Sequence, residues 1–489
     1  MRRATYIKIC KVGIIVMSAI AIYSTVMSTL PEEDVDDLNI DPKVLQYLKP
    51  KPPRKNYIKA KPTLKPRKKE VKFKEVKENE RVKVFGNVKK ITEKDINRAF
   101  IPGQYRVLGY SSDISLLSVV IGNSSDQTWD YTSVQGWEHV KYANSSFSCC
   151  FLYQSGIVRS TNTTSQISWK HDKHARIVAK QYVCPNPRSQ NEDLLPIGVT
   201  IAGTKSHGCN RNVSWYLPPH YARAHKKIVT CTKVVHSNVS ENDVLSWFEV
   251  HRKLGMEKVF VYTYDMAPNV AKILQHYQDA GIAKLIPFRL PKYYKGKQIT
   301  EIGSQFVKEW NIEQALINDC FERSKGYKYV VVLDINQYLI PYKAPSWTHL
   351  FNLLYKLNKP AAGFAFNVNL HITSWAVGNR TSKFTAGRYF NHTFPQDRNV
   401  KHVTQPEAVS GLSIYAFTPL RGFREFRAPV SQAIVHHFRS CKKSNDWEDD
   451  VDATCQNMGN YYEDKYVAKI LAPLENKIIK LKSSILNKA

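Results

Sequence analysis

The sequence lacks the glycine-rich patterns by which many nucleotide-binding proteins hold phosphate. Neither Gly-x-Gly-x-x-Gly nor Gly-x4-Gly-Lys-Ser/Thr follows any predicted strand, so the sequence supports neither a classical dinucleotide fold nor a P-loop. The sequence also lacks Cys-x-x-Cys and any closely spaced set of cysteine and histidine. We therefore predict no zinc site.

Acidic residues are scarce beside basic ones, with 42 Asp and Glu against 71 Lys and Arg and a net charge of +29. Such an excess ordinarily indicates nucleic acid, a membrane surface or another polyanion as a partner. Here residues 43–90 hold 18 Lys and Arg against 4 Asp and Glu, so about half of the excess belongs to one segment. We therefore predict no nucleic-acid partner.

Large apolar residues are rare between residues 31 and 99, where lysine and proline are abundant. Such a segment cannot bury enough apolar surface to fold alone, and its like charges and prolines keep it extended. We predict a basic stem over residues 31–99. Binding of this polybasic stretch to anionic glycans or lipid headgroups is the alternative.

Charge is absent from residues 12–30, a run of nineteen residues that follows Arg2, Arg3, Lys8 and Lys11. A stretch of this length just spans a bilayer, and the positive flank stays on the cytoplasmic side. We predict a cytoplasmic tail over residues 1–11, a transmembrane signal-anchor over residues 12–30 and a lumenal remainder. A signal peptide cleaved after Ala21 is the alternative.

Glycosylation sequons and cysteines agree with a lumenal chain. Eight of the nine cysteines follow the uncharged run, and disulfides form in oxidising compartments. We predict that some are paired, and the one pair suggested by its polar, loop-like surroundings is Cys441 with Cys455. Seven Asn-x-Ser/Thr sequons follow the run as well, at Asn123, Asn144, Asn162, Asn212, Asn238, Asn379 and Asn391.

The chain changes its rhythm near residue 226. Residues 100–225 have short apolar runs between polar clusters, which predicts a β-rich module. After them strands alternate with helices, which predicts an α/β domain with a parallel sheet and right-handed crossovers. The predicted strands are residues 228–231, 258–262, 283–286 and 329–333. Of the predicted helices, the first begins near Asn242, the second ends before Gly281 and the third spans residues 304–325.

Residues 327–341 join a buried strand to a polar turn. Residues 329–333 form an unbroken apolar, largely β-branched run, and Asp334, Asn336 and Gln337 follow directly. Because open α/β sheets bind ligands at the carboxyl ends of their strands, these side chains are candidate ligand-binding residues. A turn that merely ends the strand is the alternative, since Asp and Asn favour turns.

Five blocks in this order resemble glycosyltransferase family 92, over roughly residues 226–445. The resemblance implies a GT-A fold, which is Rossmann-like with a mostly parallel sheet, and we assign it to residues 226–475. It also implies a Golgi type II membrane enzyme that transfers a hexose with inversion to a glycan acceptor, UDP-galactose being the best-known type of donor. The alternative is an inactive family member that binds glycans or acts as a scaffold. The blocks are residues 247–255, 259–262, 318–320, 333–341 and 435–439.

The acidic motif of the family departs from its usual form in this chain. The motif of the family reads Asp-x-Asp-Glu, and in GT-A enzymes the acidic motif holds a divalent cation, usually Mn²⁺, against the donor diphosphate. Here residues 334–337 read Asp-Ile-Asn-Gln. The resemblance implies Asp334, Asn336 and Gln337 at the donor, and Asp334, Asn336, His436 and His437 as metal ligands. Because amides bring no charge to a hard cation, we expect weak Mn²⁺ binding.

An inverting transfer needs a carboxylate base near the acceptor hydroxyl. Asp397 and Glu407 lie between the acidic motif and the histidines, and the sequence does not choose between them. Basic candidates for holding phosphate are Arg388, Arg398 and Lys401. We predict structural roles outside the site for Glu249, His251 and Asp319, with Asp319 capping and solvating a helix.

Overall fold

The computed structural model describes residues 94–96, 106–107, 114–122, 131–139, 146–169, 177–187, 195–203, 209, 216–222, 225–235, 239–288, 310–440 and 462–487. All of them belong to the second of the two units into which the chain divides, residues 1–77 and 78–489. The predicted tail, signal-anchor and Cys441–Cys455 pair lie outside the described residues, as does the predicted stem apart from residues 94–96.

The predicted localisation requires correction. Among the described residues, no helix is long and apolar enough to cross a membrane. The longest of them, α11 (Tyr466–Leu486), is interrupted by charged side chains such as Lys469, Glu475 and Lys477. This finding stands against the predicted single-pass type II Golgi localisation; the predicted span, residues 12–30, lies outside the residues for which it was made.

Two antiparallel sheets precede the larger α/β part, as the short apolar runs predict. Nine residues in a row are buried in β2, which makes it a central strand. A disulfide joins Cys149 on one sheet to Cys184 on the other, and a second joins Cys150 to Cys209. One sheet is β5 (Val158–Asn162), β4 (Phe147–Leu152) and β8 (Gly198–Gly203); the other is β1 (Arg106–Val107), β2 (Ile114–Gly122), β3 (Tyr131–His139), β7 (Ile177–Pro185) and β6 (Ser165–Trp169), with β9 (His220–Tyr221) beside β2.

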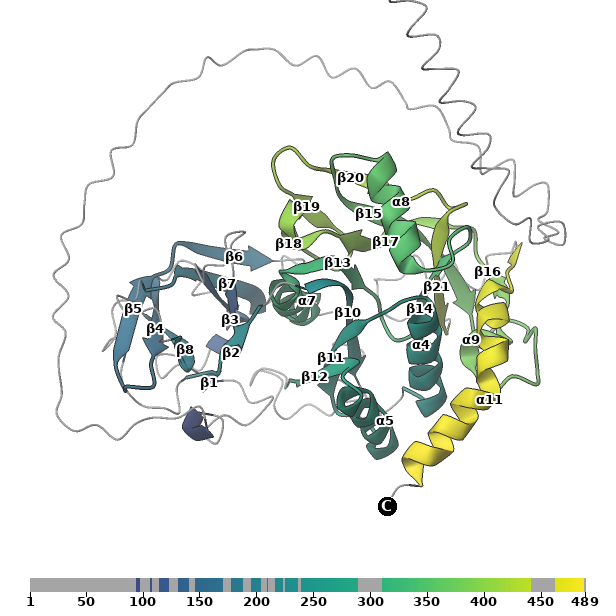
Figure 1. Ribbon diagram of the computed structural model, residues 1–489, viewed down its shortest axis with the longest axis horizontal. Helices are drawn as coiled ribbons and strands as arrows, with labels where there is room; N and C mark the ends of the chain where they lie inside the picture. Colours follow the sequence, from purple (N-terminus) through teal and green to yellow (C-terminus); the bar gives the residue numbers. More distant parts are fainter. Residues whose placement is uncertain are drawn as a thin grey trace, which may run out of the picture. The chain divides into compact units, whose positions relative to one another are not determined.

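The parallel half of the large sheet confirms the predicted alternation (Figure 1). Ser240 caps α4 by accepting a hydrogen bond from the Asp243 N–H, and Gly255, just past its end, has φ +98°, which favours glycine. The strand order is β12 (Ala283–Pro287), β11 (Lys258–Tyr264), β10 (His225–Val235) and β13 (Tyr327–Val332), and the helices are α4 (Glu241–Lys253), α5 (Pro268–Asp279) and α7 (Trp310–Ser324).

The sheet is mixed beyond β13, whereas the prediction was a mostly parallel one. Apart from α9, a single turn, and the 3-10 turn η4, no helix separates the strands between residues 361 and 439, and short connections favour antiparallel neighbours. The order continues with β17 (Gln396–Thr404), β15 (Ala361–Ile372), β16 (Asn391–His392) and β22 (Tyr462–Glu463); β21 (Ala433–Arg439) pairs with β15 and β14 (Gln337–Pro341), and β20 (Arg424–Arg427) with β15. The remaining elements are α8 (Trp347–Leu357), α9 (Thr385–Arg388), η4 (Pro406–Ala408), β18 (Val409–Leu412) and β19 (Phe417–Pro419).

Alternate side chains of the central strands enter two different cores. Val259, Val261 and Val331 face α4, α5, α8 and α11. Phe260, Tyr262, Val330 and Val332 face α7 and the residues of the β-rich sheets behind it. Helix α7 therefore lies between the large sheet and strands β2, β3 and β7.

Candidate functional site

The strand order reverses between β10 and β13. From β10 the chain moves outward to β11 and β12, and it then returns to place β13 on the other side of β10. Open α/β sheets bind ligands at such a reversal, outside the carboxyl ends of the strands. Cys231 pairs with Val332 in the parallel register, so Lys233 and Asp334, each two residues further on, come to the same edge.

Two lysines hold the Asp334 carboxylate. Lys401 Nζ on β17 lies 3.2 Å from Oδ2, and Lys233 Nζ near the end of β10 lies 3.7 Å from Oδ1. Lys233 also forms an ion pair of 2.5 Å with Glu313 on α7. The four side chains form a charge-balanced cluster of two ammonium groups and two carboxylates, which we call the lysine–carboxylate cluster.

The charges of this cluster stabilise one another. Burial alone would raise the pKa of Asp334, but Lys401, Lys233 and His437 lower it below its ordinary value. Burial would likewise lower the pKa of Lys233, and the carboxylates of Glu313 and Asp334 raise it instead. The pKa of Lys401 is raised too, against the effect of burial, by Asp334 and Tyr415. Asp334, Lys233 and Lys401 are therefore charged at neutral pH.

A small pocket of about 20 Å³ adjoins the cluster. Lys233, Asp334 and Glu313 line it together with Thr232 and the sulfur-bearing residues of the Cys231–Cys320 disulfide. That disulfide links β10 to α7 and so fixes the strand that carries Lys233 against the helix that carries Glu313. The pocket is thus built on rigid elements.

The acidic motif folds as a closed turn. The Gln337 N–H donates to the Asp334 carbonyl at 2.9 Å, and the Asp334 N–H donates to Gln337 Oε1 at 3.0 Å. Asn336 Nδ2 donates to the Phe438 carbonyl at 3.0 Å, so the turn is tied to β21. Both amides therefore have structural partners, and the alternative of a strand-ending turn describes their local role.

The two adjacent histidines lie on opposite sides of β21. His437 pairs in register with Gln337 and contributes to the charge environment of Asp334, while burial lowers its own pKa to about 3. His436 is fully buried on the other side, 2.9 Å from His371 Nε2 and 3.1 Å from the Tyr342 hydroxyl. Neighbouring residues of a strand point to opposite faces, so only His437 lies near the predicted metal site.

The residues at this site do not fit a Mn²⁺ ion. Both oxygens of Asp334 face ammonium groups, the Gln337 amide oxygen accepts from the Asp334 N–H within the turn, the Asn336 amide nitrogen donates to the Phe438 carbonyl on β21, and His436 lies on the other face. Within the described part of the chain, no group of three or more His, Cys, Asp or Glu side chains could hold a metal ion.

The candidate bases lie toward opposite ends of β17 and are both exposed. Strand β17 runs antiparallel to β13, with Thr404 beside Val330. Asp397 therefore lies toward the carboxyl end of β13, where the pocket is, and Glu407 toward its amino end. Of the basic candidates, Lys401 joins the cluster and Arg388 ends α9, while the Arg398 side chain lies outside the described residues.

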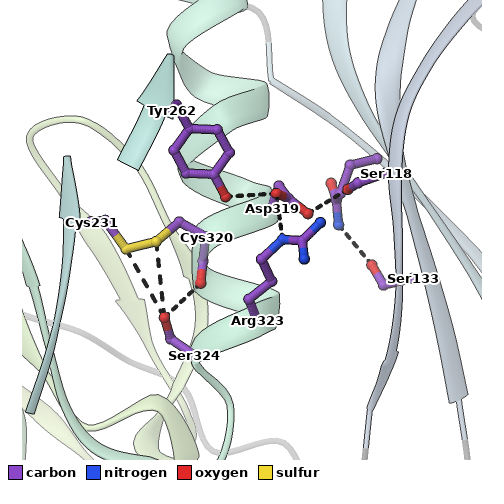
Figure 2. Close-up of polar contacts among 9 residues, drawn as sticks. Ser118, Ser133, Cys231, Tyr262, Asp319, Cys320, Arg323 and Ser324 are labelled. Carbon is purple, nitrogen blue, oxygen red and sulfur yellow. Dashed lines mark hydrogen bonds and ion pairs between the residues drawn. A yellow bond between two sulfur atoms is a disulfide. The ribbon is translucent and has the colours of Figure 1, made fainter. Parts of the chain in front are cut away.

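Asp319 lies outside the pocket, and it is buried rather than solvated, contrary to the prediction. It is buried on α7, where it accepts hydrogen bonds from Tyr262 Oη at 2.6 Å, Arg323 Nε at 2.8 Å and Ser118 Oγ (Figure 2). The prediction that Glu249 and His251 are structural is confirmed. Glu249 binds Arg252 and Tyr277, and His251 packs among Trp247, Tyr338 and Trp347.

Sequence reasoning missed Lys233 and Glu313. The available signal for Lys233 was its place two residues after a predicted strand, at the expected ligand edge. Glu313 had no comparable signal, because only the packing of α7 brings it to β10.

A model of glycosyltransferase family 92 matches residues 226–480, just over half of the chain. The comparison with curated proteins gave no match.

The solved structures to which the chain is similar include the following three. The mannosyltransferase PcManGT from Pyrobaculum calidifontis, in complex with GDP-Man and Mn²⁺, has 9% identity and a TM-score of 0.28 over 53% of this chain and 74% of that one. S. aureus TarS 1–349 with UDP-GlcNAc has 10% identity and a TM-score of 0.24 over 54% and 67%. GalNAc-T7 with UDP, GalNAc and Mn²⁺ has 10% identity and a TM-score of 0.24 over 53% and 56%. At these TM-scores the likeness carries no conclusion about this chain.

Proposed function

Because the chain belongs to glycosyltransferase family 92, we propose that it transfers a hexose from a nucleotide-sugar donor to a glycan acceptor. The observation that carries this proposal is the lysine–carboxylate cluster beside a pocket, at the carboxyl ends of β10 and β13. A donor is expected at this reversal of strand order. We take the donor to be a UDP-sugar, with UDP-galactose as the first candidate, and the domain to be of GT-A type.

The proposed reaction is a single displacement with inversion. The acceptor hydroxyl attacks the anomeric carbon as the bond to the diphosphate oxygen breaks, and a carboxylate takes the hydroxyl proton. Of the two candidate bases, the direction of β17 favours Asp397, because it lies toward the pocket edge of the sheet. The Lys233 ammonium group at that edge would stabilise the nucleoside diphosphate as it leaves.

The second candidate function is a family member without transfer activity that binds glycans or acts as a scaffold. One observation favours it: both amides of the altered motif are engaged within the turn and with β21. Under this alternative the protein would bind sugars or nucleotide sugars and release no nucleoside diphosphate.

The test is release of UDP by the full chain from UDP-galactose, UDP-glucose and UDP-GlcNAc, each offered with a panel of galactose- and GlcNAc-terminated glycans. We expect acceptor-dependent release from one donor. Asp334→Asn should lower the rate at least tenfold, because it removes the charge that positions both lysines. The matched control is Asp279→Asn on the exposed end of α5, which should leave the rate unchanged. Donor binding without release from any pair would favour the second candidate.

A further inference from the structure

We propose that this protein holds the diphosphate of its donor without a divalent cation, through the ammonium group of Lys233, while Lys401 positions Asp334. The inference rests on the proposed function and specifies the chemistry of the same site. It assigns to Lys233 the positive charge that a metal ion would otherwise bring to the diphosphate.

The first observation is that positive charge already surrounds the motif carboxylate. Lys401 lies 3.2 Å from Asp334 Oδ2, and Lys233 lies 3.7 Å from Oδ1, so each oxygen has an ammonium group near it. A dication bound to the same oxygens would lie next to two like charges, which repel it. The departure from the family motif and the presence of the lysines therefore both weaken the binding of a divalent cation.

The second observation divides the roles of the two lysines. The Lys233 side chain is 28% exposed and that of Lys401 only 5%. Lys233 lines the pocket, and an ammonium group has three N–H donors, of which Glu313 takes one. Lys233 can therefore reach a phosphate oxygen, whereas Lys401 is confined to holding Asp334 in place.

Glu313 competes with the ligand in this arrangement. Its carboxylate lies 2.5 Å from Lys233 Nζ, and a diphosphate must share or displace that contact. Removing the Glu313 charge should strengthen diphosphate binding. A purely structural ion pair predicts the opposite, since breaking it would only loosen the site.

The experiment is calorimetric titration of UDP and of the three UDP-hexoses into the full chain, with EDTA and separately with MnCl2. For the donor that binds, we expect dissociation constants that agree within threefold between the two conditions. Lys233→Met should weaken binding at least tenfold in both. The matched control is Lys272→Met, an exposed lysine on α5, which should bind as the unaltered protein does.

A second variant distinguishes a lost contact from a loss of folding. Glu313→Gln should tighten UDP binding in EDTA three- to tenfold, a gain that an unfolded protein cannot give. Lys401→Met should weaken binding less than Lys233→Met, because it acts through Asp334.

The outcomes separate this inference from the proposed function. Binding that requires Mn²⁺ would overturn the inference and leave the proposed function standing. The same holds for metal-free binding that Lys233→Met does not change. Absence of binding by every nucleotide in both conditions would overturn the two together.

Discussion

At the scale of single residues, position 336 requires a side chain that donates a hydrogen bond. Asn336 Nδ2 donates to the Phe438 carbonyl at 3.0 Å, so Asn336→Asp would set a carboxylate oxygen against a carbonyl oxygen. We expect the free energy of unfolding to fall by about 1–3 kcal/mol, the usual cost of an unpaired buried polar group. Urea denaturation at pH 7 measures it.

A matched control for this substitution exists on β15. Asn367 Oδ1 accepts a hydrogen bond from Arg427 Nη1 at 3.0 Å, so Asn367→Asp keeps an acceptor in place and adds attraction to the guanidinium group. Its stability should stay within about 0.5 kcal/mol of the unaltered protein or rise. Equal losses at both positions would contradict the role assigned to Asn336.

His251 makes stability depend on pH. It is fully buried among Trp247, Tyr338 and Trp347, and burial lowers its pKa to about 3, against about 6.5 in the unfolded chain. Between these values the unfolded state binds the extra proton. Stability is therefore full above pH 6.5 and falls by about 1.4 kcal/mol per pH unit below it for this histidine.

His251→Phe isolates this effect, because phenylalanine keeps the aromatic contacts and cannot be protonated. We expect the slope of unfolding free energy against pH, between pH 6.5 and 5, to be smaller in the variant by about 1.4 kcal/mol per unit. All other histidines are the same in both proteins. Parallel curves would show that His251 is not the neutral, buried group described.

At the scale of elements, α7 depends on its buried charges. Asp319 binds Arg323, Tyr262 and Ser118 at once, and the Arg323 side chain is only 11% exposed. Asp319→Ala leaves that guanidinium group without its carboxylate, which should cost about 3–5 kcal/mol. Asp279→Ala, at the exposed end of α5, serves as the control and should cost less than about 0.5 kcal/mol. Similar losses from the two variants, in urea denaturation, would refute the buried role of Asp319.

The elements that the sequence predicts well are those with local signals. A few neighbouring residues are enough to recognise the capping serine of α4, the glycines that end helices and the apolar run of β13. The pairing of β14 with β21 joins residues about a hundred positions apart, and no local sequence pattern predicts such a pairing. The mixed half of the sheet was missed for that reason.

The residues of the site also divide into those with a local sequence signal and those whose place depends on long-range pairing. Asp334 was found because it follows a buried strand, and Lys401 was named only as one of several basic residues. The partnership of Asp334 with Lys233 depends on the parallel register of β10 and β13, and that with Lys401 on the antiparallel neighbour β17. The side chains of His436 and His437 lie on opposite faces of β21, because neighbouring residues of a strand alternate. The family resemblance, which treats the two histidines as a pair, does not show this separation.

At the scale of the whole molecule, the β-rich sheets and the α/β part share buried polar contacts. Gln181 Nε2 on β7 donates to Glu322 Oε1 on α7 at 2.8 Å, Tyr131 donates to Glu322 Oε2 at 3.1 Å, and Ser118 on β2 binds Asp319. Buried carboxylates that lose such donors are costly. The two parts should therefore be stable only together.

We predict that a chain beginning at residue 226 will not fold, whereas a chain beginning at residue 78 will unfold in one cooperative transition. Calorimetry and limited proteolysis under identical conditions compare the two. A sharp transition and protease resistance in the shorter chain would mean that the β-rich sheets are a dispensable neighbour.

The most direct test of metal-free donor binding is an experimental structure of the full chain with UDP bound in the presence of EDTA. We predict a diphosphate oxygen within about 3.2 Å of Lys233 Nζ, at hydrogen-bond distance, with Lys401 still on Asp334. A diphosphate bound away from β10 and β13, or one that enters this edge only when Mn²⁺ bridges it to Asp334, would contradict this prediction.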